Sequence, residues 1–174
     1  MSPDLIIDCE TTGLSFTTSR IVSIAWIVLD KHRRIDTQYH VIKLDHINPE
    51  STNIHGITVE YSQQHGIDIK TCLRKLQKTI HKFKCETLVA HNVHFDYNML
   101  IHEMRRSRFF TLHYTFYHMK KVCTMRLAKT KLNLVKNPKL TNLYEQLTHK
   151  KLDNAHNAQI DTEACCVCYK ILRC

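Results

Sequence analysis

Two acidic side chains, Asp8 and Glu10, stand one residue apart in the segment LIIDCETTGL, residues 5–14. The apolar residues before them predict a buried strand, and side chains alternate along a strand, so both carboxylates project from one face and Cys9 from the other. Two like charges this close repel each other unless a cation lies between them, and carboxylate oxygens favour Mg²⁺ or Mn²⁺. The pair therefore predicts a divalent-metal site or, in the simpler interpretation, a solvated acidic turn.

A third acid, Asp96, lies in VAHNVHFDYNML, residues 89–100, where a short strand gives way to a helix with an apolar side. An acid in the first turn of a helix commonly serves as a cap or as a partner of the helix dipole. The neighbouring Phe95 favours a different interpretation, because an aromatic ring beside an acid at the carboxyl end of a strand suits base stacking next to a metal.

A fourth acid, Asp161, follows His156 by five residues in AHNAQIDTEA, residues 155–164. On one continuous helix these two residues would lie about 140° apart, so both reach one site only if His156 precedes the helix. Asn154 is a candidate cap just upstream. The nearby helix N-terminus favours the neutral form of His156, which is the form that a general base needs.

The surrounding pattern predicts the elements that must position these residues. The β-branched runs 20–30 and 35–44 flank the polar KHRR and predict a hairpin, so three antiparallel strands open the domain. Apolar spacing predicts further helices and strands, with the last third mainly helical. These segments are a helix at 71–83, a strand at 87–91, a helix at 95–107, a fifth strand within 116–124, and helices at 139–147 and 158–172. The order predicts an α/β fold, a mixed sheet covered by helices.

The chain has 174 residues and no internal repeat or Pro/Gly/Ser linker, so we expect a single domain over residues 1–174. Its formal charge of +9 is typical of a protein with a polyanionic partner, or it serves as a solubilising surface charge. Two basic clusters are candidates for phosphate contacts, although charged runs are usually solvated faces: Arg105, Arg106 and Arg108, and Lys129, Lys131, Lys136 and Lys139. Neither a signal peptide nor an apolar run of about 20 residues is present, which predicts an intracellular protein.

Eight cysteines in such a chain predict thiols rather than a disulfide framework. Cys165, Cys166 and Cys168 include a C-x-x-C spacing, so a zinc scaffold is an alternative. No second Cys or His pair stands at zinc-finger spacing, and the three cysteines follow an apolar helical pattern. Buried thiols are the simpler interpretation.

Taken in order, the segments IDCETTGL, IHGIT, AHNVHFD, CTMRLAK, LTNL and AHNAQIDTEA resemble the DEDD exonucleases of the histidine-containing branch. That family includes the epsilon proofreading subunit of bacterial DNA polymerase III and ribonuclease T. The resemblance runs from Leu5 to about Ala164. It implies an RNase H-like fold with a five-stranded mixed sheet, three strands antiparallel and two parallel, and a two-metal 3′-to-5′ exonuclease mechanism.

The resemblance also implies roles for individual residues and two Mg²⁺ or Mn²⁺ ions as cofactors. Asp8 would bridge both ions, Glu10 and Asp161 would complete the first site, and Asp96 would support the second, partly through water. His156 would accept a proton from the attacking water. The implied substrate contacts are Leu14 and Ile57 against the terminal nucleotide, Asn92 at its sugar or phosphate, Phe95 on a base, and Thr11 and Thr12 at the 3′ end.

We expect the substrate to be the 3′ end of single-stranded or frayed DNA, released as nucleoside 5′-monophosphates. The first alternative is an exoribonuclease acting on RNA or short oligoribonucleotides, since contacts to the 2′-OH are not visible in a sequence. A domain that binds nucleic acid without cleaving it is the alternative from another class. A DNA polymerase partner, a homodimer, and a cellular or viral source all stay open at this stage.

Overall fold

The computed structural model describes residues 2–173 and contains a five-stranded mixed sheet with the strand order β3-β2-β1-β4-β5. Antiparallel pairs join β1 to β2 and β2 to β3, and parallel pairs join β1 to β4 and β4 to β5. The strands are β1 (Asp4–Thr11), β2 (Ile21–Asp30), β3 (Arg33–Val41), β4 (Thr87–Ala90) and β5 (Lys120–Cys123). This architecture confirms the predicted α/β fold.

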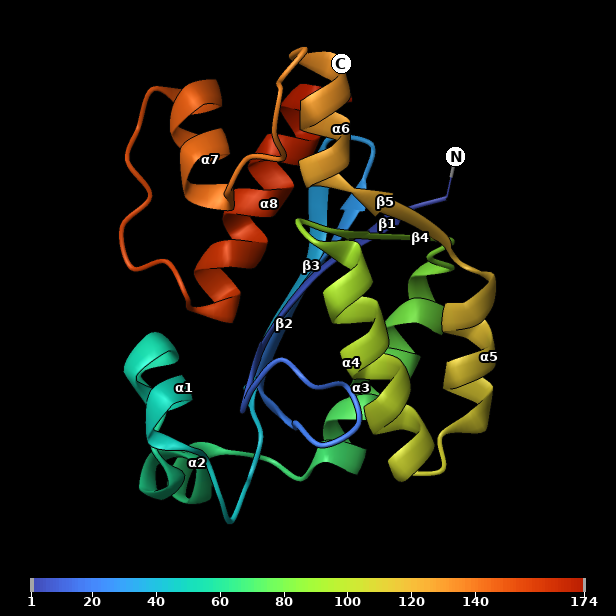
Figure 1. Ribbon diagram of the computed structural model, residues 1–174. Helices are drawn as coiled ribbons and strands as arrows, with labels where there is room; N and C mark the ends of the chain where they lie inside the picture. Colours follow the sequence, from blue (N-terminus) through green and yellow to red (C-terminus); the bar gives the residue numbers. More distant parts are fainter. Residues whose placement is uncertain (1, 174) are drawn as a thin grey trace.

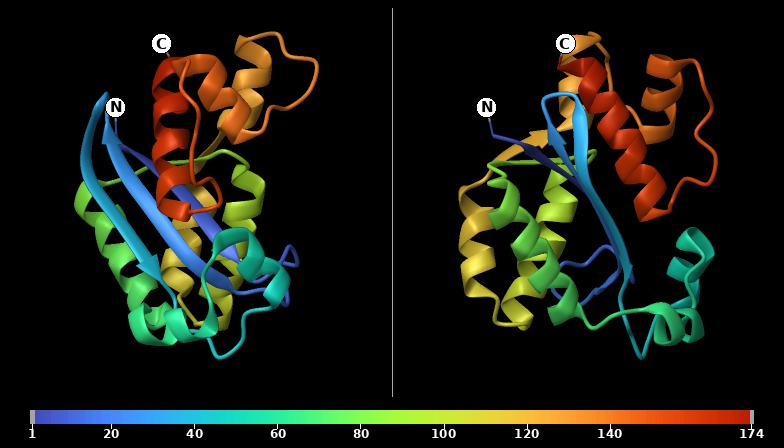
Figure 2. Two further views of the ribbon diagram at one scale, coloured as in Figure 1. Left: turned by 90° about the vertical axis from the view of Figure 1, so that its left-hand side faces the viewer. Right: turned by 180° about the vertical axis from the view of Figure 1, so that it is seen from behind.

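Helices cover both faces of the sheet (Figures 1 and 2). On one face lie α3 (Ile69–Phe83), α4 (Val93–Arg106) and α5 (Phe110–His118). The opposite face carries α6 (Thr124–Lys131), α7 (Leu140–Thr148) and α8 (Ala158–Leu172). Two short helices, α1 (Pro49–His55) and α2 (Val59–His65), lie beyond the end of the sheet where β1 finishes (Figure 1).

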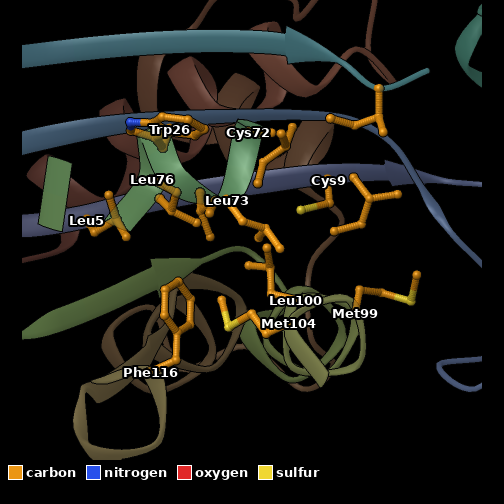
Figure 3. Close-up of a cluster of buried hydrophobic side chains, with 14 of the residues drawn as sticks. Leu5, Cys9, Trp26, Cys72, Leu73, Leu76, Met99, Leu100, Met104 and Phe116 are labelled. Atoms are coloured by element: carbon orange, nitrogen blue, oxygen red, sulfur yellow. The ribbon is translucent and has the colours of Figure 1, made fainter. Parts of the chain in front are cut away.

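Alternation along β1 divides its side chains between two cores. Leu5, Ile7 and Cys9 pack with α3 and α4, whereas Ile6 packs with cysteines of α8. In the larger core, Leu73 and Leu76 of α3 meet the strands, and Leu100, Met104 and Phe116 close the layer from α4 and α5 (Figure 3). The apolar side chains of β1 are therefore buried on both faces of the sheet. Apart from Asp4 at its start, its polar side chains lie toward its carboxyl end.

Polar contacts join the N-terminal end of β1 to the C-terminal end of α8. Asp4, at the start of β1, accepts hydrogen bonds from Arg173 at 2.7 Å and from the Tyr169 hydroxyl at 3.1 Å. Because α8 packs on β1 and β2, this contact fixes the start of the strand against the end of the helix. The other end of β1 consequently meets the N-terminus of α8.

The prediction for residues 116–124 was partly wrong. Residues 116–118 end α5, and only Lys120–Cys123 form β5. The aromatic-rich α5 sequence resembles a strand in propensity, but Leu112 and Phe116, four residues apart, are both buried on one side of a helix. The short helices α1 and α2 were not predicted either. Asn48 and Thr58 accept first-turn N–H groups at their starts, at Ser51 and Tyr61.

Seven cysteines of the described chain are free thiols, as expected. Cys165, Cys166 and Cys168 are buried in the packing of α8. Within residues 2–173, the one group of His, Cys, Asp and Glu side chains close enough to hold a metal contains no cysteine, which argues against the zinc alternative. None of the described helices is long and apolar enough to cross a membrane.

Candidate active site

The carboxyl end of β1 presents the first two acids on one face of the sheet. Asp8 pairs with Ala25 and Glu10 with Ser23 across β2, and the register shifts immediately after Glu10. Cys9, between them, is buried in the core on the opposite face. This arrangement confirms the predicted alternation and directs both carboxylates toward α8.

Asp161, in the first turn of α8, completes a group of three acids. One carboxylate oxygen each from Asp8, Glu10 and Asp161 lies within 4.8 Å of the others. The Oδ1 atom of Asp161 is buried and has no hydrogen-bond partner among the described residues. Three clustered carboxylates, one of which keeps an unpartnered oxygen, form a donor set that fits a hard divalent cation such as Mg²⁺ or Mn²⁺.

His156 precedes α8, as the spacing to Asp161 predicted. Its backbone N–H donates to Oδ2 of Asp161 at 2.9 Å, and its own backbone is left-handed, with φ 68°. The expected cap at Asn154 is wrong, because Asn157 accepts the first-turn N–H groups of Gln159 and Ile160. The exposed imidazole is therefore attached to a backbone that already positions one of the acids.

Asp96 is 4% exposed and lies one turn inside α4, which begins at Val93. It does not serve as the N-cap; instead its Oδ1 accepts the N–H of Cys9 on β1 at 3.1 Å. Asp96 is not one of the three acids within 4.8 Å of each other. Its charge nevertheless raises the pKa of Asp8, which places it at the same site.

Burial and mutual repulsion disfavour the charged form of these acids. Burial, and then the charges of Asp96, Asp161 and Glu10, raise the pKa of Asp8 well above its ordinary value. Burial raises the pKa values of Glu10 and Asp96 to about 7. Burial also raises the pKa of Asp161, which the contact with His156 partly offsets. A bound cation would stabilise the charged form of these carboxylates, because its positive charge offsets their mutual repulsion.

A cavity of about 630 Å³ opens beside the acids. Its walls are the end of β1 with the following loop, α1, the first turn of α4, and His156. Of the predicted substrate contacts, Thr11, Thr12, Leu14 and Phe95 line it. Leu14 is 83% exposed, so an apolar side chain without a partner stands at the entrance.

Two predicted contacts lie elsewhere. Ile57 is buried in the large core and does not line the cavity, whereas Ile54, 58% exposed in α1, does. The segment IHGIT is the end of a helix, which Gly56 closes with a left-handed φ of 76°, and the signal for that helix was the Asn48-Pro49 start. Asn92 lines a second cavity, on the other side of α4.

The loop between β1 and β2 is held by a residue that the sequence reasoning did not identify. Glu103 of α4 is fully buried and accepts from Arg20 Nε at 2.8 Å and from the N–H of Ile21 at 3.2 Å. Arg106 lies 3.2 Å from Glu103 and donates to the carbonyls of Phe16, Thr17 and Ser19. Arg106, a candidate for phosphate binding, therefore supports the loop.

Comparisons with known proteins identify the family and the fold. A model of the RNase_T exonuclease family matches residues 5–169. A segment of 126 residues, 72% of this chain, is 30% identical to the PolC-type DNA polymerase III of Mycoplasmopsis pulmonis (strain UAB CTIP), of which it covers 8%.

Among solved structures, exonuclease I of E. coli in complex with a dA16 oligonucleotide superimposes with a TM-score of 0.83 at 19% identity, over 99% of this chain and 41% of that chain. Exonuclease I from Methylocaldum szegediense gives a TM-score of 0.75 at 17% identity, over 99% of this chain and 40% of that chain. These likenesses show a shared fold. The chain spans about two fifths of the exonuclease I chains and a small part of the polymerase.

Proposed function

Because the chain belongs to the RNase_T exonuclease family, within the DEDD exonucleases of the RNase H-like superfamily, we propose that it removes nucleoside 5′-monophosphates from the 3′ end of single-stranded DNA with the help of divalent metal ions. The observation that carries the proposal is the three-acid cluster of Asp8, Glu10 and Asp161 beside an open cavity. A protein that only binds nucleic acid has no need of buried acids with raised pKa values.

Asp8, Glu10 and Asp161, together with Asp96, would hold two Mg²⁺ or Mn²⁺ ions. Such ions stabilise the charge on the attacking and leaving oxygens of a phosphoryl displacement. Asp96 keeps only part of its carboxylate for this role, because Oδ1 accepts the N–H of Cys9.

His156 would act as the general base that accepts a proton from the attacking water. Its side chain lines the active-site cavity, and its backbone is fixed through Asp161. Since that contact uses the N–H of the main chain, the imidazole is free to turn toward the cavity. Leu14, Ile54 and Phe95 would pack against the terminal nucleotide from three walls of the same cavity.

The substrate assignment rests on two supports. E. coli exonuclease I has been solved with dA16 and dT13 oligonucleotides, and this chain shares its fold. The name of the PolC-type relative describes a DNA polymerase. Both favour DNA over the RNA alternative for this chain.

The test is a denaturing gel with 5′-labelled single-stranded DNA, matched RNA and a recessed duplex, in Mg²⁺, Mn²⁺ or EDTA. We expect a metal-dependent ladder that shortens from the 3′ end, fastest on single-stranded DNA. Asp8→Asn should abolish it, whereas Glu145→Gln, which removes an exposed acid of α7, should not. Immediate release of the labelled terminal nucleotide would contradict the direction, and intact substrates in every condition would contradict catalysis.

A further inference from the structure

The second cavity, of about 360 Å³, adjoins the active site across a single helical turn. Phe95 of α4 lines the active-site cavity, while His94 and Tyr97 of the same helix, with Asn92 just before it, line the second. The remaining wall comes from α5, β5, α6 and Asn137 in the segment between α6 and α7. A strand that leaves the active site over the start of α4 would therefore enter this cavity next.

Aromatic rings and cations meet inside it. The Lys121 ammonium lies 4.9 Å from the centre of the Tyr97 ring and 5.9 Å from that of Tyr117. Tyr117 is 64% exposed, so much of its ring is open to a ligand. Arg126 supplies a second exposed cation, and none of the described residues that line the cavity is acidic.

This combination matches the chemistry of single-stranded nucleic acid. A base has a flat face that stacks on an aromatic ring, and the adjoining phosphate requires a positive charge. The N-terminus of α4, at the border of the two cavities, adds a partial positive charge for a phosphate that crosses it. Lys121 also donates to the Tyr117 carbonyl at 2.5 Å, whereas an apolar ligand would leave Arg126 without a role, and an acidic peptide would leave the open tyrosine face without one.

We propose that this second cavity binds a nucleotide upstream of the scissile end, with its base on Tyr117 and its phosphate between Lys121 and Arg126. The proposal rests on the proposed function, since the strand must begin in the active-site cavity. It extends that function by making affinity depend on strand length. A dinucleotide fills the active site alone, whereas a longer strand occupies both cavities.

The test compares Tyr117→Ala with Tyr114→Ala. Both tyrosines are exposed on α5 and both contact His118, but only Tyr117 lines the cavity. Binding is measured in Ca²⁺ by fluorescence anisotropy of a labelled single-stranded pentadecamer, and binding of an unlabelled dinucleotide by competition. We expect Tyr117→Ala to weaken binding of the pentadecamer about tenfold and to leave the dinucleotide unchanged. Lys121→Gln should reduce the salt dependence of pentadecamer binding.

Equal binding of the pentadecamer by the two tyrosine variants would overturn the proposal. An equal loss on the dinucleotide would also overturn it, because the effect would then lie in the active site or in folding. Failure of the proposed function has a different signature. Wild-type protein would cleave nothing in Mg²⁺, while the difference between the two variants in binding would persist.

Discussion

Replacing Glu10 with glutamine should stabilise the metal-free protein while removing its activity. Burial and the charge of Asp161 raise the pKa of Glu10 from 4.5 to about 7. Between pH 4.5 and about pH 7, Glu10 therefore keeps its proton in the folded protein and has lost it in the unfolded chain. Its stability falls as the pH rises through that window, and the full cost is present above the folded pKa. Glutamine has the shape of the protonated acid and avoids this cost.

The magnitude follows from the displacement of the pKa. At about 1.4 kcal/mol for each pH unit, the rise from 4.5 to about 7 corresponds to about 3 kcal/mol. Water reaches part of the Glu10 side chain, so we expect about 2 kcal/mol to be recovered. For a chain of this size, that is an increase of about 5 °C in the melting temperature.

The assay is thermal unfolding in EDTA at about pH 8 and about pH 5, for wild type, Glu10→Gln and the exposed control Glu145→Gln. The variant should unfold at higher temperature than wild type at the higher pH and should approach it at the lower. Saturating Mg²⁺ should stabilise wild type more than the variant, because glutamine removes one of the three carboxylates that we propose as metal ligands. Equal or lower stability of Glu10→Gln at about pH 8 in EDTA would refute the reasoning.

Three further predictions follow from the site. His156→Asn, which tolerates the left-handed backbone, should keep DNA affinity but lower kcat about 100-fold, and a loss below about tenfold would remove His156 from the role of base. Glu103→Ala should lower the free energy of unfolding by about 3 kcal/mol, measured in urea, because it leaves the Arg20 guanidinium and the Ile21 N–H without their acceptor. A loss below about 1 kcal/mol would contradict that account. Ca²⁺ should permit DNA binding and support little cleavage on gels, since its coordination is looser than that of Mg²⁺; rapid cleavage in Ca²⁺ alone would contradict the metal assignment.

The sequence was informative where one periodicity dominates. The period of two in β1 placed Asp8 and Glu10 on one face, and the separation of His156 from Asp161 placed the histidine before α8. Both results depend on local geometry alone. The carboxylate cluster itself needed the resemblance, because no spacing rule brings residue 8 to residue 161.

Local patterns were insufficient where tertiary packing decides. In α5, β-branched and aromatic residues favour a strand, yet burial of Leu112 and Phe116 produces a helix. Ile57 was expected to lie against the terminal nucleotide, but it is buried in the large core, and the unpredicted helix α1 presents Ile54 to the cavity instead. Glu103 was not identified from the sequence, and only the fold shows that it meets the β1–β2 loop.

The contact of Asp4 with Arg173 and Tyr169 holds the start of β1 against the end of α8. The attraction at this end opposes the repulsion at the other, where the carboxylates of Asp8, near the end of β1, and Asp161, in the first turn of α8, lie close together. The ion pair at one end thus keeps the two carboxylates close together at the other, despite their repulsion. A cation at the proposed metal site would then meet carboxylates that are already in place, and its binding would require little movement of the backbone.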